Sequence, residues 1–411
     1  MKALTTIICL AIPFPRPRRR LRTWMKHKFP GRTKLSDLLR LIRYARNRNV
    51  VLWFDHSLGG GTETYSLNQF AQMRKSSEVI IRIQYFPANK MFGLSAPNNT
   101  RLSKYMVNSL SGVYDAVHKM NISQIVVNNL VGYPLSTDIL GLVAELKNQN
   151  NAFVSFRGHD FQSICPSFNL INCDGAFCNF KYKSGCETCW RNKKLGNNEY
   201  ENGVLRSGAT SVAKWRAAWG HFFAETADQI IVFSASIGKM FAHIYPQLQE
   251  KIVIIPHAVQ PLRRVNIAPH DGINIACLGY MQEVKGRDII LDMCNKLRAS
   301  DNVHITVIGD MDGRGDIVPN LTVTGRYKPS DLPDIIERRN IDLIFIPSIW
   351  PETFSYTTAE AMSMGLPVAC YDMGAPAERV GEYARGLVLS EINPEKNLHE
   401  IIEFIQKLKR N

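Results

Sequence analysis

Short apolar runs alternate with segments in which apolar residues recur at helical spacing along most of the chain. The run VVLWF at 50–54 is typical of a buried strand, and a glycine-rich turn and a helical pattern follow it. Strands separated by helical patterns in this way form parallel βαβ units. The sequence therefore predicts an α/β fold in its first half. Further strand-like runs in this half lie at 124–130, 151–156, 228–234 and 251–259.

The same alternation resumes after a proline-containing stretch at 261–271, where we place the boundary between two domains. Two Rossmann-like halves are the simplest architecture that this repetition predicts, and ligands of such halves bind outside the carboxyl ends of the strands. In the second half, strands are expected at 273–279, 302–310, 321–325, 341–347 and 366–372, with helices at 287–297, 329–339 and 356–364. The predicted parts are an arm at 1–48, a domain at 49–260 with a cysteine-rich insertion at 161–208, a domain at 261–390 and a C-terminal helix at 391–411.

Positive charge is concentrated in the arm. Residues 1–48 hold 14 of the 50 Lys and Arg residues and one of the 36 acids, so they carry +13 of the net charge of +14. The apolar run at 3–12 is too short to span a bilayer. One lysine precedes this run and no small-residue cleavage site follows it, which argues against a signal peptide.

Residues 35–48 of the arm predict an amphipathic helix. Its apolar face holds Leu35, Leu38, Leu39 and Ile42, and arginines occupy the rest. Such a helix can lie on an anionic membrane surface. It can equally pack its apolar face on the core and leave its basic face in water. Nucleic-acid binding is not predicted, because no recognition-helix or aromatic pattern accompanies the charge.

Candidate binding residues follow several predicted strands. Gly59, Gly60 and Gly61 come after the first strand, where a backbone without Cβ atoms can approach a phosphate or sugar closely. Lys285 opens a helix after the strand at 273–279, against the preference of the helix dipole. We therefore expect Lys285 to have an anionic partner such as a diphosphate.

A histidine–aspartate pair, His159 and Asp160, follows the strand at 151–156. Such a pair can steer hydroxyl groups and stabilise developing charge. Both residues are therefore candidates for a catalytic role.

The segment PETFSYTTAE at 351–360 carries two carboxylates, Glu352 and Glu360. Carboxylates accept hydrogen bonds from paired sugar hydroxyls, and free backbone N–H groups at a helix start can receive a phosphate or sugar oxygen. One carboxylate for a sugar, one for a ribose and an anion site between them suit a sugar nucleotide. The N–H groups concerned belong to Phe354, Ser355 and Tyr356.

Residues 348–380, SIWPETFSYTTAEAMSMGLPVACYDMGAPAERV, resemble the donor-site signature of retaining glycosyltransferases of family four, with its Glu-x7-Glu. LGGGTETY, IIPHAV, LGYMQEVKGRD and VIGD resemble further pieces of the family in the same order, so the resemblance spans roughly residues 50 to 390. It implies a GT-B fold, with two Rossmann-like domains facing across a cleft. The C-terminal domain would hold a nucleotide-sugar donor and the N-terminal domain an acceptor.

The resemblance also implies roles around the transferred sugar. Glu352 would contact the donor sugar, Glu360 the ribose hydroxyls, and His159 would lie beside the transferred sugar. The family retains the anomeric configuration and requires no metal or other cofactor for catalysis, with the leaving phosphate helping to deprotonate the acceptor. His257 stands where the family usually has Asn.

At the diphosphate, the resemblance implies that Lys285 neutralises the leaving group and that Gly60 and Gly61 face it. Tyr280 stands where the family commonly has a phosphate-binding Arg, so one expected cation is missing. The candidates to replace it are Arg287 and Arg326.

Asp310 and Asp312 have the Asp-x-Asp spacing of the metal site in the other large glycosyltransferase fold. Here the pair begins the loop after a predicted strand, where family four usually has a Gly-Asp turn. We therefore expect it to bind no metal.

Five of the nine cysteines lie between 165 and 189, in C-x-x-C and C-x4-C spacings that fit structural zinc. The segment also resembles an insertion in some bacterial polysaccharide glycosyltransferases. Reduced thiols without a metal are the alternative, and disulfides are not expected in a chain without an export signal. The resemblance favours the zinc ligands Cys165, Cys178, Cys186 and Cys189.

These observations predict a hexosyltransferase that moves a sugar from a UDP- or GDP-sugar to a growing glycan in lipopolysaccharide O-antigen or capsule assembly. The basic arm suggests a lipid-linked acceptor and a peripheral location on the inner face of the cytoplasmic membrane. Two alternatives stay open: an enzyme with a soluble sugar acceptor, and a non-catalytic protein that binds a nucleotide sugar or glycan on the same fold.

Overall fold

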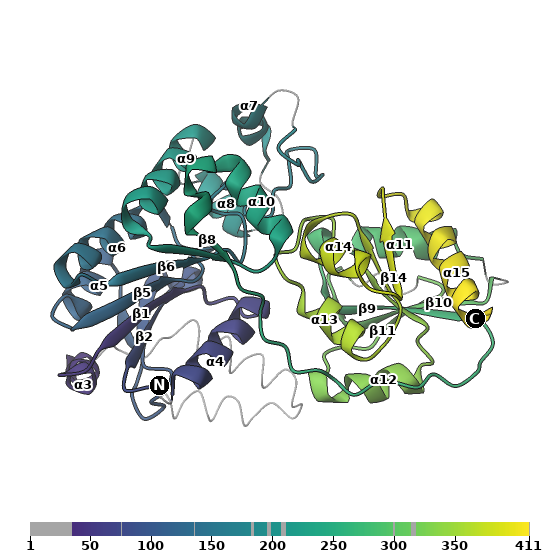
Figure 1. Cartoon of the computed structure of the whole chain (residues 1–411), viewed down its shortest axis with the longest axis horizontal. Coiled ribbons are helices and arrows are strands. Elements are labelled where there is room, and N and C mark those ends of the chain that lie inside the picture. The colour runs from purple at the N-terminus through teal and green to yellow at the C-terminus, as the bar shows by residue number, and fades with distance from the viewer. Residues whose placement is uncertain are drawn as a thin grey trace, which may run out of the picture. The chain divides into compact units, whose positions relative to one another are not determined.

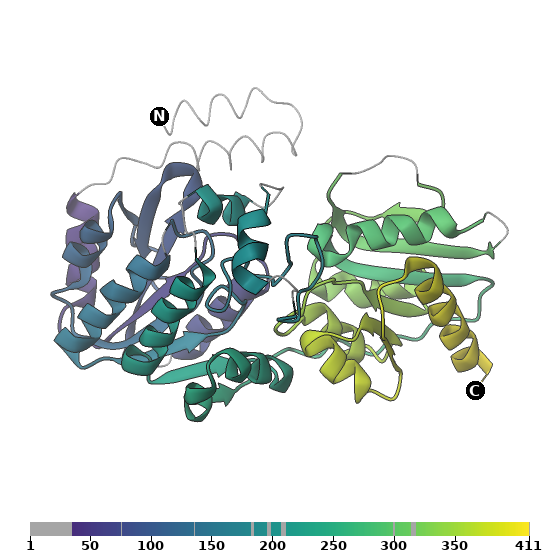
Figure 2. The same ribbon diagram turned by 90° about the horizontal axis from the view of Figure 1, so that it is seen from above.

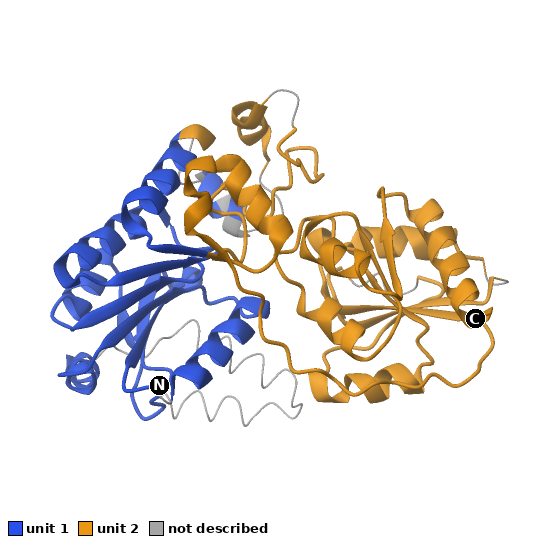
Figure 3. Ribbon diagram, in the orientation of Figure 1, with its two compact units in different colours: residues 1–157, 195–209, 214–230 blue, residues 158–194, 210–213, 231–411 orange. Residues whose placement is uncertain are grey.

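The computed structural model describes residues 35–74, 76–134, 136–181, 185–194, 199–206, 211–298, 301–313 and 318–410 (Figures 1 and 2). The chain divides into two units (Figure 3). Unit 1 holds the described residues within 1–157, 195–209 and 214–230, and unit 2 those within 158–194, 210–213 and 231–411. The predicted domain bounds stay predictions. Residues 1–34 of the predicted arm, with their apolar run, lie outside the described residues.

Eight strands of the described chain form the first sheet, in the order β4-β3-β2-β1-β5-β6-β7-β8. The buried strand β1 runs parallel to β2 and β5, and β5 runs parallel to β6. The alternating pattern predicts β1, β5 and β6, whereas β2 was not among the expected strands. β3 pairs antiparallel with both β2 and β4, an edge that the pattern did not predict. The strands are β1 (Val50–Asp55), β2 (Val79–Phe86), β3 (Met91–Ser95), β4 (Tyr105–Val107), β5 (Ile122–Val127), β6 (Phe153–Arg157), β7 (Gln229–Val232) and β8 (Ile252–Ile254). The α-helices of this half are α3 (Leu35–Ala45), α4 (Gly61–Met73), α5 (Leu110–Val117), α6 (Ser136–Asn150), α7 (Gly185–Asn192), α8 (Glu199–Arg206), α9 (Val212–His221) and α10 (Ala235–Ile244).

Six described strands of unit 2 form the second sheet, in the order β11-β10-β9-β12-β13-β14, and all their pairs are parallel. The chain starts at the central strand β9, moves outward to β11, and then returns to β12 on the other side of β9. The strand order therefore reverses between β9 and β12, which is where doubly wound sheets bind their ligands. The strands are β9 (Ile273–Met281), β10 (Val303–Met311), β11 (Leu321–Val323), β12 (Leu343–Ile346), β13 (Val368–Tyr371) and β14 (Gly386–Leu389). The helices are α11 (Arg287–Lys296), α12 (Leu332–Arg338), α13 (Tyr356–Ser363), α14 (Gly374–Gly381) and α15 (Pro394–Arg410).

Apolar side chains bury both faces of this second sheet. One cluster joins the strands to α11 and α15, and the other joins them to α12, α13 and α14. All four residues of β12 are buried. The near-continuous apolar runs of the sequence thus reflect strands that are covered on both faces.

Gly286 shows how closely the loop after β9 approaches β12. It has a φ of +83°, and a Cβ built on it would lie 2.1 Å from the carbonyl oxygen of Pro347. Only glycine allows this contact without displacing the backbone. The preceding residue, Lys285, is therefore held against the carboxyl end of β12.

Helix α3 confirms the predicted helix at the end of the arm. It buries Leu41 and Ala45, whereas Leu35 and Leu39 are 69% and 55% exposed. The helix therefore packs on the core by one edge and also presents apolar side chains to solvent. Among the described helices, none combines the length and the apolar composition that crossing a bilayer requires.

Candidate functional site

An ion pair joins the two strand ends at the reversal of the second sheet. The ammonium of Lys285, after β9, lies 2.7 Å from a carboxylate oxygen of Glu352, after β12. Ser348 Oγ donates a hydrogen bond to the same oxygen. Burial by itself would raise the pKa of Glu352, but Lys285 and the hydrogen bonds from Lys285, Ser348 and Ser355 lower it below its ordinary value. The carboxylate is therefore ionised and fixed in position.

A cavity of about 130 Å³ opens beside this ion pair. It combines one cation, one carboxylate and a glycine near the carboxyl end of β9, so it suits a polar, anionic ligand. Tyr280 lies at the rim and is 52% exposed. The lining comes from Leu278, Gly279, Tyr280, Met281, Lys285, Phe345, Ile346, Pro347, Ser348, Glu352 and Thr357.

The turn that leads into α13 has an unusual backbone. Ser355 is the N-cap, with φ 65° and ψ 93°, and its Oγ accepts a hydrogen bond from the backbone N–H of Thr358 at 3.4 Å. A non-glycine residue in such a conformation costs roughly 1–3 kcal/mol, so the surrounding structure must hold it. The turn places the start of α13, with the residues Phe354 to Tyr356, next to Glu352. The anion-binding role of the backbone N–H groups of these residues stays a prediction.

Glu360 lies on α13 and has a different environment from Glu352. Within the described residues its carboxylate has neither an ion pair nor a hydrogen-bond donor, and burial raises its pKa to about 7. Burial, and after it the charge of Glu360, raises the pKa of Tyr327, so the side chains of Glu360 and Tyr327 lie near each other. The two predicted carboxylates therefore have different pKa values. Glu352 is ionised at neutral pH, whereas Glu360 gains and loses its proton near pH 7.

His159 and His257 lie together in unit 2, with ring centroids 5.3 Å apart. The backbone carbonyl of His159 accepts a hydrogen bond from Thr353 Oγ1 at 2.9 Å, which ties it to the Glu352 segment. Burial and the charge of Arg379 lower the pKa of His257 to about 3, so its ring is neutral. Asp160 accepts the backbone N–H of Gln162 at 2.7 Å and thereby shapes the loop after β6.

The glycine turn after β1 belongs to unit 1. Gly59 and Gly60 have φ values of +85° and +78°, and α4 begins at Gly61. The neighbouring Asp55 is fully buried and pairs with Arg82 at 2.6 Å. The sequence did not single out this buried ion pair, because its members lie on two separate strands.

Both candidates for the cation expected in place of Tyr280 pair with carboxylates in the described structure. The Tyr280 hydroxyl donates to Asp312. Arg287 is paired with its neighbour Asp288 at 2.7 Å. Arg326 lies 3.4 Å from Asp310, and its side chain is 93% exposed.

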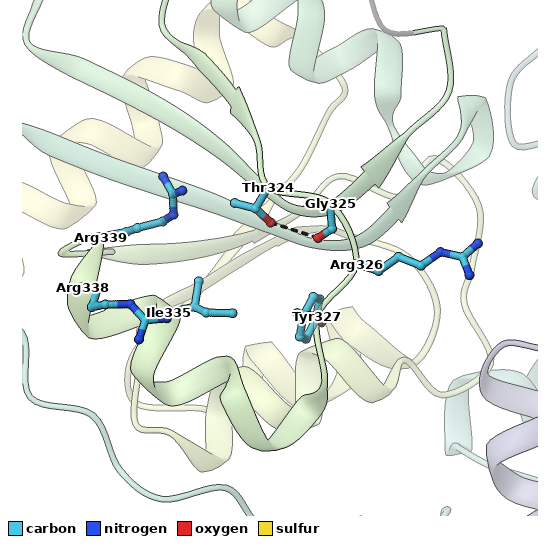
Figure 4. Close-up of a pocket in the computed structure, with 7 residues that line it drawn as sticks. All are labelled: Thr324, Gly325, Arg326, Tyr327, Ile335, Arg338 and Arg339. Atoms are coloured by element: carbon cyan, nitrogen blue, oxygen red, sulfur yellow. Dashed lines mark hydrogen bonds between the residues drawn. The ribbon is translucent and has the colours of Figure 1, made fainter. Parts of the chain in front are cut away.

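A second cavity, of about 360 Å³, lies at the end of β11 along α12 (Figure 4). Thr324 donates to the carbonyl of Gly325, and Arg338 and Arg339 have no ion pair with any carboxylate in the described chain. The cavity is therefore cationic, and through Tyr327 it adjoins Glu360. Its lining residues are Thr324, Gly325, Arg326, Tyr327, Ile335, Arg338 and Arg339.

The cysteine-rich insertion brings Cys173 against Cys189, whose sulfur accepts the backbone N–H of Cys173 at 3.3 Å. Burial, with the Cys173 thiol adjacent, raises the pKa of Cys189 to about 11. No group of three or more His, Cys, Asp and Glu side chains in the described ranges is arranged to hold a metal ion. Zinc at Cys165, Cys178, Cys186 and Cys189 stays a prediction.

The sequence reasoning did not identify Ser348 and Arg379. Ser348 ends the run IDLIFIPS, so its place at a strand end was a usable signal. Arg379, on α14, donates a hydrogen bond to the carbonyl of Ser355 at 3.0 Å. No sequence pattern marked this arginine, because it lies 24 residues from its partner.

Residues 272–407, which lie in unit 2, match the family Glycosyl transferases group 1. No curated protein matches the chain in sequence. The structure is similar to Anabaena Alr3699/HepE in complex with UDP-glucose, with a TM-score of 0.51, 15% identity, and 88% of this chain and 90% of that chain covered.

Two further solved structures are similar. Sucrose-phosphate synthase (tll1590) from Thermosynechococcus elongatus has a TM-score of 0.55 and 13% identity, with 87% of this chain and 90% of that chain covered. The lipopolysaccharide outer core galactosyltransferase WaaB in its apo form has a TM-score of 0.50 and 12% identity, with the same coverage. At these identities the likeness shows the fold, and the predicted GT-B fold is confirmed.

Proposed function

We propose that this chain is a retaining glycosyltransferase that moves a hexose from a UDP- or GDP-sugar to a growing surface glycan. The observation that carries the proposal is the Lys285–Glu352 pair at the switch point of the second sheet, with Glu360 on the adjoining helix. The glycosyl transferases group 1 domain at 272–407 supports it. So does the fold shared with a protein that was solved in complex with UDP-glucose.

In this proposal Lys285 and the N–H groups at the start of α13 hold the donor diphosphate, since both present positive charge to the same cavity. Glu352, held ionised, accepts hydroxyl groups of the donor sugar. The bond from the anomeric carbon to the diphosphate breaks while an acceptor hydroxyl attacks the same face. The leaving phosphate takes the hydroxyl proton, so charge and protons balance without a second base.

The nucleoside end of the donor would extend from the ion pair towards β11. Glu360 would accept the ribose hydroxyls, and its neighbour Tyr327 leads into the cationic cavity at the end of β11. Strands in a sheet lie about 4.8 Å apart, so β9 and β11 are separated by roughly 10 Å. This spacing accommodates a nucleoside between the diphosphate and the sheet edge.

The test is turnover of a panel of UDP- and GDP-sugars with a polyprenyl-diphosphate-linked acceptor, in parallel with free sugar acceptors. We expect transfer from one donor to the lipid-linked acceptor, with the anomeric configuration retained in the product. Inversion would refute the proposed mechanism. Transfer only to free sugars would establish the soluble-acceptor alternative, and donor binding without any transfer would establish the non-catalytic one.

We also propose that the basic arm and α3 bind an anionic membrane surface. The exposed Leu35 and Leu39 lie on a helix that also carries Arg40 and Arg43. Each basic residue near an anionic surface contributes about 1 kcal/mol, and the apolar side chains add to this.

Sedimentation with vesicles that contain anionic phospholipid tests this proposal. Removal of residues 1–34, or the double change Leu35→Ser and Leu39→Ser, is expected to weaken binding by about tenfold or more. Leu67→Ser is the control, because Leu67 is 53% exposed and belongs to α4 rather than to α3. Equal binding by the wild type and both arm variants would show that this segment is no membrane anchor.

A further inference from the structure

Arg379 is a partly buried cation whose guanidinium donates its hydrogen bonds to backbone carbonyls. In the part of the chain that the structure describes, it forms no ion pair with a carboxylate, and burial lowers its pKa below the ordinary value. Its guanidinium donates to the carbonyl of Ser355 at 3.0 Å and lies 4.5 Å from the ring centroid of Phe354. Removing part of a guanidinium from water costs free energy, so the contacts that Arg379 makes here must offset that cost.

The residue that Arg379 holds is the one with the strained backbone. Ser355 has φ 65° and ψ 93°, backbone angles that residues other than glycine rarely adopt. Its Oγ accepts the hydroxyl of Thr358 at 2.9 Å and the backbone N–H of the same residue at 3.4 Å. The side chain and the carbonyl of Ser355 are thus held separately, the carbonyl by Arg379.

The residue before the turn is held as well. Phe354 is 6% exposed and contacts Arg379 on α14 and the ring of His257, whose centroid lies 4.3 Å away at an interplanar angle of 29°. Because burial and Arg379 lower the pKa of His257, the ring beside the guanidinium is uncharged. The turn is therefore packed from two segments that are distant in sequence.

This turn links Glu352 to α13. The hydroxyl of Ser355 contributes to the low pKa of Glu352, and the backbone N–H groups after Ser355 begin the helix. A turn that relaxed to an ordinary conformation would move both the carboxylate and the N–H groups. The conformation that Arg379 stabilises is thus the one that shapes the candidate site.

We propose that Arg379 is a positioning residue for the donor site: it holds the turn at Ser355 in its strained conformation, so that Glu352 and the start of α13 face the nucleotide sugar. The inference rests on the proposed function for the identity of the ligand. In this inference Arg379 acts through the turn at Ser355 and not through a contact with the donor.

The test is a double-mutant cycle on the full chain. Arg379→Met is expected to weaken donor binding by about tenfold or more, since a charged hydrogen bond is lost. In a Ser355→Gly background, Arg379→Met is expected to weaken donor binding by less than about threefold, because glycine adopts this backbone conformation without strain. Ser355→Ala is the matched control, since it removes the hydroxyl and keeps the strain, so the full loss should persist in that background.

The rate of amide hydrogen exchange at Thr357 and Thr358 reports the stability of the turn in the absence of any donor. Arg379→Met should accelerate exchange in the wild-type background and change it little in the Ser355→Gly background. Arg385→Met, which removes another arginine that donates to a backbone carbonyl, should leave these amides unchanged.

Three results would overturn the inference. An equal loss of donor affinity in all backgrounds would mean that Arg379 binds the donor directly. A lower melting temperature with unchanged donor affinity would mean that Arg379 supports only the fold. Unchanged exchange at both amides would mean that the turn does not depend on Arg379. If the wild type binds no nucleotide sugar, the proposed function fails, and the exchange data still decide whether Arg379 holds the turn.

Discussion

Replacement of Lys285 by methionine is expected to reduce transfer at low donor concentration by about 10²–10³-fold, the loss that follows removal of one group that stabilises developing charge. The physical reason is the position of its ammonium, 2.7 Å from Glu352 and on the wall of the cavity beside the ion pair. Steady-state kinetics with the preferred donor measures this loss. The matched control is Lys296→Met, a solvent-exposed lysine of α11 that pairs with Glu395.

The same variant is expected to lose stability in a pH-dependent way. In the wild type the pKa of Glu352 lies below its ordinary value of 4.5, so its stabilisation is present above that pH and is lost on acidification. Without Lys285, burial raises the pKa instead, and the cost of the buried charge grows as the pH rises. We expect a loss of about 1–3 kcal/mol at pH 8 that shrinks towards pH 4, less than for a fully buried pair because the Lys285 side chain is 34% exposed.

Thermal unfolding between pH 4 and 8 checks this second effect. The double variant Lys285→Met with Glu352→Gln should recover most of the stability at pH 8, since no buried charge remains, and should stay inactive. A loss of stability that is equal at both pH values would show that the ion pair is not its source.

Replacement of Glu360 by glutamine is expected to stabilise the fold and weaken donor binding at the same time. Burial raises the pKa of Glu360 from 4.5 to about 7, so in the wild type the stability falls as the pH rises through this window. Glutamine removes this dependence, and we expect a gain of up to about 3 kcal/mol at pH 8. Donor affinity at that pH should fall by about 10–100-fold, the effect of losing charged hydrogen bonds to the ribose.

Measurements of stability and of donor affinity as functions of pH separate the two effects of Glu360→Gln. Wild-type donor affinity should increase as the pH rises through about 7, because only the ionised carboxylate accepts both ribose hydroxyls, and the affinity of the variant should be flat. Binding to the wild type at pH 7 should release protons, which calorimetry in buffers of different ionisation enthalpy detects. The exposed Glu395→Gln is the control, and a wild-type affinity that does not vary with pH would exclude ribose recognition by Glu360.

The sequence by itself determined most elements of the second sheet, with β14 and α14 as exceptions, and the strand ends where chemistry was expected. Apolar runs and helical spacing reflect local burial, so the strands and helices around Lys285 and Glu352 could be predicted without coordinates. The short strands β3, β4 and β14 were missed, because short edge strands bury less and leave a weaker pattern. The longer buried strand β2 was also missed, although its apolar run VIIRIQYF is a usable signal.

Only the tertiary structure decided which of these residues meet. The pairing of Lys285 with Glu352 depends on β9 and β12 being neighbours in the strand order, which no local pattern encodes. The same holds for Arg379 and the carbonyl of Ser355, and for Cys173 beside Cys189. Two glutamates eight positions apart have opposite pKa shifts, because Lys285 compensates burial at Glu352 and no cation among the described residues does so at Glu360.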